Sequence, residues 1–142
     1  ITNEGVARLA SSRLSQLAID FTAVESAAIL PLRCLSLKKL SIGGTLCNDE
    51  ALRMAALFPS LQSITAYLTN ITADGLFAFC DHPQINHIAV QDTRITEAEA
   101  RRFKERRPDV DLSWKLSNPY AKMFEEHGRP AHVERLIHLL PP

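Results

Sequence analysis

A repeat of about 24 residues constrains this chain more than any other feature. Its clearest copy, Leu61 to Pro83, places apolar residues at Leu61, Ile64 and Ala66 before the phrase Ile71-Thr72-Ala73-Asp74-Gly75-Leu76. The copies are marked by threonines spaced 23, 24 and 24 residues apart, at Thr22, Thr45, Thr69 and Thr93. The repeat therefore predicts an architecture, and recognition or chemistry must come from the residues that the template leaves free.

Each copy combines two hydrophobic periods. Pairs such as Leu40/Ile42 alternate at period two, which predicts a short strand with one buried face. Ile71, Leu76 and Phe79 recur at helical spacing. Helices are expected to start after the capping residues Thr2, Asn48, Thr72 and Thr96. A column of small residues, where neighbouring units are expected to approach closely, comprises Gly5, Ala28, Ala51 and Gly75 and is broken by Glu99.

One strand and one helix in about 24 residues cannot bury their own apolar faces, so the units must stack. Stacking predicts an α/β fold, a right-handed solenoid with a parallel strand sheet on the concave side and helices on the convex side. We expect residues 1–114 to form about five repeats of ~24 residues. The second unit departs from the template at Val24-Glu25-Ser26-Ala27-Ala28 and has Pro31, so a short or irregular helix is expected there.

The template L-x-x-L-x-L-x-x-T-x-I-T-x-x-G-L resembles the leucine-rich repeat, in the bacterial subtype that carries threonine where most repeats carry asparagine. It is also similar to the cysteine-containing repeats of F-box proteins. The resemblance covers Ile1 to Trp114. It implies that the marker threonines bond backbone groups between adjacent coils, a role that would fall to Thr22, Thr45, Thr69 and Thr93.

Composition excludes several classes of function. Sixteen basic and 16 acidic residues give a net charge of zero, which argues against a nucleic-acid or anionic-membrane partner. No apolar run approaches the length of a membrane span. Three cysteines without CxxC spacing predict small buried side chains in a reducing, cytoplasmic environment: Cys34, Cys47 and Cys80. The chain begins in mid-motif at Ile1, so we expect it to belong to a longer protein.

The sequence carries no signature of catalysis, a metal or a cofactor. Gly-rich phosphate loops and the GxSxG, HExxH and CxxC motifs are missing, and the five histidines lack metal-ligand spacing on a shared face. We therefore expect a protein that is not an enzyme and needs no cofactor. The one charge run is expected to lie on the solvent face of the last helix and comprises Arg101, Arg102, Lys104, Arg106 and Arg107.

The outward positions of the strands are the best candidates for recognition, because side chains alternate between the two faces of a sheet. The expected activity is binding of a protein partner, whose identity and oligomeric state the sequence leaves open. Two central residues, Tyr67 and His87, are of the types enriched in interfaces or capable of adaptable hydrogen bonding. The candidate partner-binding residues are Lys39, Ser63, Thr65, Tyr67, His87, Gln91 and Asp111.

Alternatives remain at this point. The chain could be the recognition or regulatory domain of a larger protein, such as a bacterial effector, an F-box-like adaptor, or an enzyme whose catalytic part lies elsewhere. Residues 115–142 are expected to form a C-terminal helical extension, with Asn118-Pro119 starting one helix and Gly128 following its end. This extension either caps the open end of the repeat core or docks a partner.

Deleting the chain after Trp114 distinguishes the two roles of the extension. An unfolded or insoluble product, measured by circular dichroism, is the result expected of a cap, because the last core residues would lose their cover. A folded product that no longer captures a partner would contradict the cap and support docking.

Overall fold

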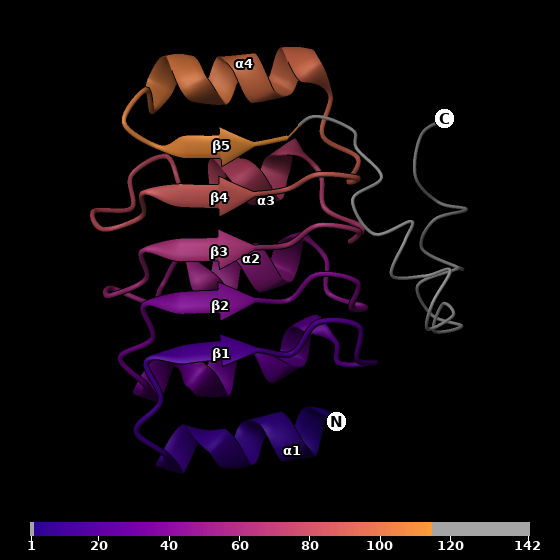
Figure 1. Ribbon diagram of the computed structural model, residues 1–142, viewed down its shortest axis with the longest axis vertical. Coiled ribbons are helices and arrows are strands. Elements are labelled where there is room, and N and C mark those ends of the chain that lie inside the picture. Colours follow the sequence, from indigo (N-terminus) through magenta and orange to yellow (C-terminus); the bar gives the residue numbers. More distant parts are fainter. Residues whose placement is uncertain (1, 115–142) are drawn as a thin grey trace.

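A parallel five-stranded sheet forms the frame of the computed structural model, which describes residues 2–114 (Figure 1). Helices lie along one face of the sheet, with α1 and α4 at its two ends. The elements in chain order are α1 (Asn3–Arg8), the 3-10 helix η1 (Leu9–Ser11), β1 (Gln16–Ala18), the 3-10 helices η2 (Ser26–Ala28) and η3 (Leu30–Cys34), β2 (Lys39–Ser41), α2 (Asp49–Ala55), β3 (Ser63–Thr65), α3 (Ala73–Phe77), β4 (His87–Ala89), α4 (Glu97–Arg106) and β5 (Asp111–Ser113).

The strands follow each other in the order β1-β2-β3-β4-β5, each parallel to the next. Their register places the same position of every unit in one row, so that Leu40 pairs with Ile64 and Ile64 with Ile88. The predicted α/β class, with parallel strands on one side and helices on the other, is confirmed. The irregular second unit is confirmed as well, since it has two 3-10 helices where other units have an α-helix.

One hydrophobic core runs between the sheet and the helices. The inward strand residues are buried as predicted, among them Ile42, Ile64 and Val90, and three phenylalanines fill the helix side: Phe58, Phe79 and Phe103. Leu17 on β1 and Leu112 on β5 are only partly buried. These two lie on the edge strands, where a neighbouring strand covers only one side.

A left-handed residue ends the strand portion of each of the first four units. Phe21, Gly44, Leu68 and Asp92 have φ angles of 58°, 65°, 51° and 54°, each immediately before a marker threonine. This conformation is uncommon for residues other than glycine. Hydrogen bonds between units hold it in place: Phe21 donates its N–H to the Gly43 carbonyl at 2.8 Å, and Leu68 donates to Gln91 at 3.1 Å.

The marker threonines act within their own units, which corrects the role implied by the resemblance. The hydroxyl of Thr45 donates to the Ile42 carbonyl at 2.7 Å, and that of Thr69 donates to the Ala66 carbonyl at 2.6 Å. Thr22 and Thr93 make the same bond to the residue three positions earlier. Each of these hydroxyls therefore stabilises the left-handed turn that precedes it.

The helix starts, by contrast, are bonded between units. Asn3 accepts a hydrogen bond from the Glu25 N–H at 2.9 Å. One unit later the Ser26 hydroxyl accepts from the Asn48 N–H at 3.0 Å, and in the next the Asp49 carboxylate accepts from the Thr72 N–H at 2.7 Å. Each first helical residue therefore satisfies a backbone donor at the start of the following helix, a group that no helix can satisfy with its own carbonyls.

The last helix start uses a different acceptor. Ala73 has no side-chain acceptor to offer, and the Thr96 N–H donates instead to Glu99 at 3.0 Å within its own unit. Thr96 is thereby confirmed as a helix cap, and together with Glu99 it forms a capping box. A Cβ on Gly75 would collide with the Asp49 carboxylate, which explains the small residue at this position of the column.

The cysteines differ in burial. Cys47 is fully buried as predicted, Cys80 is partly buried, and Cys34 is exposed, so the prediction of three buried thiols is wrong for Cys34. The irregular second unit accounts for the difference, because its short 3-10 helix ends at Cys34 before the chain turns back to the core. Within residues 2–114, no helix combines the length and the hydrophobicity that a membrane span requires.

Asp49→Ala tests the bonding between helix starts. We expect the free energy of unfolding to fall by about 1–2 kcal/mol, because a carboxylate that accepts from both the N–H and the hydroxyl of Thr72 is lost. Urea denaturation measures it. Glu50→Ala is the matched control, since it removes an exposed carboxylate from the same helix turn. Equal losses in the two variants would contradict the bridging role.

Thiol labelling tests the burial of the cysteines. Burial raises the pKa of Cys47 to about 11, so almost no thiolate forms at neutral pH, and iodoacetamide should modify it only after unfolding. Cys34 should react in the folded chain, and mass spectrometry of the labelled peptides separates the two. The raised pKa also predicts that Cys47 contributes stability below the ordinary thiol pKa of about 8.5 and loses it as the pH rises toward 11. Rapid labelling of Cys47 in the folded chain would contradict this account.

Candidate interaction surface

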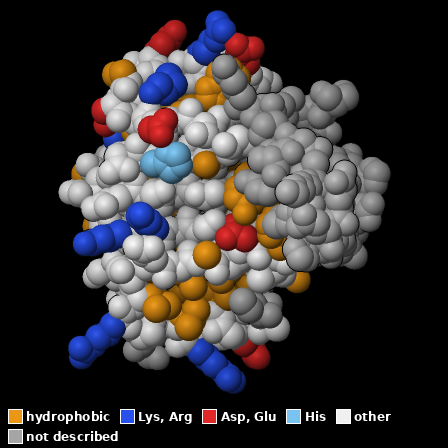
Figure 2. Space-filling view, in the orientation of Figure 1, with side chains coloured by type: hydrophobic (Ala, Val, Ile, Leu, Met, Phe, Trp, Pro, Cys, Tyr) orange, Lys and Arg blue, Asp and Glu red, His pale blue; other side chains and the backbone are white. Residues whose placement is uncertain are grey.

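The sheet face opposite the helices carries a row of aligned polar side chains (Figure 2). The strand register places Gln16, Lys39, Ser63, His87 and Asp111 next to one another, one from each strand. Four of the seven predicted partner-binding residues therefore fall in a single row. Thr65 lies in the neighbouring row with Ser41.

A depression of about 360 Å³ lies over β1, β2 and β3 on this face. Its volume is near the lower end of the range for ligand pockets, roughly 300–1,000 Å³. Most of the lining residues are uncharged, and one is a lysine. They are Gln16, Leu17, Ala18, Lys39, Leu40, Ser41, Ser63 and Thr65. Three predicted residues (Lys39, Ser63 and Thr65) belong to it. Leu17 was missed because its spacing predicts a core residue; it is partly exposed only because β1 is an edge strand.

His87 and Asp111 form a pair on the same face. Nδ1 of His87 lies 3.1 Å from Oδ2 of Asp111. Their side chains are 35% and 77% exposed, so solvent screens the interaction and the pair is weak. Asp111 therefore already has a partner. His87 and Asp111, the predicted residues on β4 and β5, do not line the depression over β1–β3.

Tyr67 and Gln91 lie beyond the ends of β3 and β4, outside the depression. The Tyr67 ring packs over the backbone of Gly43, where a Cβ would collide with it, and its centroid lies 5.9 Å from that of Phe21. Within the described residues, the buried side-chain oxygen of Gln91 has no hydrogen-bond partner. Tyr67 thus packs between units, and its substitution would affect folding as well as any binding.

Asp20 is also committed to the fold. Its Oδ1 accepts from the Ser41 hydroxyl at 2.6 Å and from the Gly43 N–H at 2.8 Å, which links the first unit to the second. The alternation of side chains along the first strand predicts that Asp20 points outward. Alternation predicts the direction of a side chain, but it cannot predict that a backbone N–H of the next unit lies within reach.

The basic run does not form one surface. Arg107 is only 12% exposed, and its guanidinium donates to the carbonyls of Phe79 at 2.8 Å and His82 at 3.0 Å. It also pairs with Asp109 at 2.9 Å, and the hydrogen bond from Arg107 lowers the pKa of that carboxyl. The prediction of a solvent-facing run is therefore wrong for Arg107. The backbone carbonyls after α3 supply the acceptors, and sequence spacing cannot reveal them.

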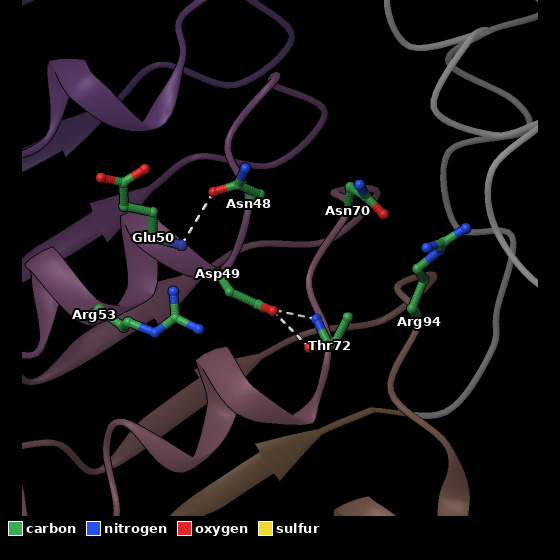
Figure 3. Close-up of a pocket in the computed structure, with 7 residues that line it drawn as sticks. All are labelled: Asn48, Asp49, Glu50, Arg53, Asn70, Thr72 and Arg94. Carbon is green, nitrogen blue, oxygen red and sulfur yellow. Dashed lines mark hydrogen bonds between the residues drawn. The ribbon is translucent and has the colours of Figure 1, made fainter.

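A second, polar pocket of about 340 Å³ lies beside the helix starts (Figure 3). Nothing in the residue pattern predicts this pocket. Three of its polar residues already make hydrogen bonds, since Asp49 accepts from Thr72 and Asn48 accepts from the Glu50 N–H at 3.0 Å. Within residues 2–114, no cluster of His, Cys, Asp and Glu is arranged to hold a metal ion. The pocket is lined by Asn48, Asp49, Glu50, Arg53, Asn70, Thr72 and Arg94.

No protein-family model and no curated protein matches the chain. Among solved structures, the chain is similar to one described as "Leiomodin-1 Actin-Binding Site 2 (ABS2)", with a TM-score of 0.63 and 12% sequence identity. The similarity covers 96% of this chain and 85% of the other. At this level of identity the likeness concerns the fold alone.

Proposed function

We propose that the chain is a leucine-rich-repeat solenoid that binds a protein partner through its open sheet face and is not itself an enzyme. The solenoid is supported by units of 23 or 24 residues that pair in register, strand to strand, along the whole described chain. It is also supported by hydrogen bonds that repeat between successive helix starts.

The observation that carries the binding proposal is the open sheet face. Every helix of residues 2–114 lies on the other side of the sheet or at its ends, and the open side presents polar side chains around a shallow depression. Interfaces of this kind combine a partly apolar centre with a polar rim. Here Ala18 and the partly exposed Leu17 supply the apolar surface, and Lys39 and Ser63 lie beside them.

The structural neighbour supports the same class of function. Its description names a protein-binding site, and its fold extends over most of both chains. The likeness supports recognition of a protein rather than of actin in particular. Within this proposal, the chain serves as the recognition domain of a larger protein, and residues 115–142, which lie outside the described residues, are the second candidate docking element.

Thr65→Arg tests the proposed face. An arginine at this central, half-buried position would cover the depression, so we expect partner affinity to fall about tenfold or more, which corresponds to ~1.4 kcal/mol. The chain is used to capture a partner from cells of its host, and the affinity of each variant for that partner is then measured by calorimetry. Glu105→Arg introduces the same side chain on the exposed surface of α4, at the end of the sheet and away from the depression, and should bind normally.

Unchanged affinity of Thr65→Arg, with loss of binding in the α4 variant, would place the interface on the helices and contradict the proposal. Circular dichroism of both variants ensures that loss of binding is not loss of folding.

A further inference from the structure

Lys39 is the one charged side chain among the eight that line the depression. It is exposed on β2, and its neighbours in the row, Gln16 on β1 and Ser63 on β3, are both neutral. Within the described residues, no carboxylate lies within ion-pair distance of its ammonium group. The depression therefore has a positive charge at one side, with no carboxylate of residues 2–114 to pair with it.

The acidic groups nearest to the depression are already occupied. The Asp20 carboxylate accepts hydrogen bonds from Ser41 and Gly43 at 2.6 and 2.8 Å. Asp111 lies on β5, three strands away from Lys39 on β2, and pairs with His87. Within residues 2–114, the depression thus offers the Lys39 ammonium group, with which no carboxylate pairs, next to apolar surface from Ala18 and the partly exposed Leu17.

The dimensions of the depression suit a short extended segment. Three neighbouring strands are about 10 Å apart from first to last, since adjacent strands lie about 4.8 Å from each other. An extended peptide rises about 3.3 Å per residue, so roughly three residues cross β1 to β3.

We propose that the occupant of this depression is an extended peptide segment of a protein partner that carries an aspartate or glutamate next to an apolar residue. The carboxylate pairs with Lys39, and the apolar side chain covers Leu17 and Ala18. This inference rests on the proposed function and adds to it the chemical class of the partner.

Selection from a random heptapeptide library displayed on phage tests the inference with the full 142-residue chain. The wild-type chain should enrich sequences in which Asp or Glu is adjacent to Leu, Val or Phe. Lys39→Glu should reverse the preferred charge to Lys or Arg, and synthetic peptides from the wild-type selection should bind Lys39→Ala about two- to fivefold more weakly, the range of an exposed ion pair. Arg33→Glu, an equal charge change at an exposed residue of η3, is the control and should leave the selection unchanged.

Ser63→Arg, which blocks the depression, separates this inference from the proposed function. If the wild-type chain enriches peptides without a carboxylate, and Ser63→Arg abolishes that enrichment, the face binds peptides but the acidic class is wrong. If the wild-type chain enriches nothing beyond what Ser63→Arg enriches, the depression is no peptide site, and both the inference and the proposed face are overturned.

Discussion

The fold depends on bonds that each unit can make only with its neighbour. A helix leaves its first N–H groups without intrahelical partners, and here the preceding unit supplies the acceptor, as Asp49 does for Thr72. The strand portion behaves in the same way, because the left-handed residue Leu68 donates to Gln91 of the next unit. A single unit would have neither these bonds nor a buried core, so stability requires the stack.

Because each unit must bond and pack against its neighbour, only some outward residues remain available for recognition. Inward side chains such as Ile64 form the core, and the marker threonines hold the turns. Several outward residues are engaged as well, since Asp20 links two units and Tyr67 packs over Gly43. What is left on the sheet face is the depression over β1–β3, with Lys39 beside it, and this is where we place the proposed function.

Much of the fold could be predicted from the sequence, because period, capping and alternation are local properties. The spacing of Thr96 and Glu99 is that of a capping box. The repeat of about 24 residues predicts that the strands follow each other in chain order. The site could be predicted only in part. The roles of Asp20, Tyr67 and Arg107 depend on backbone atoms 22 to 28 residues away, whose position follows from the three-dimensional stacking and not from local pattern.

The most direct test of the account is the map of NMR chemical-shift changes on the isotope-labelled chain when its captured partner is added. The account predicts that the largest changes cluster at residues around the depression, such as Lys39, Ser41 and Thr65, and that the outer surfaces of α2 and α4 are unaffected. Changes confined to the helices, with the sheet face unperturbed, would contradict the claim that the open face is the recognition surface.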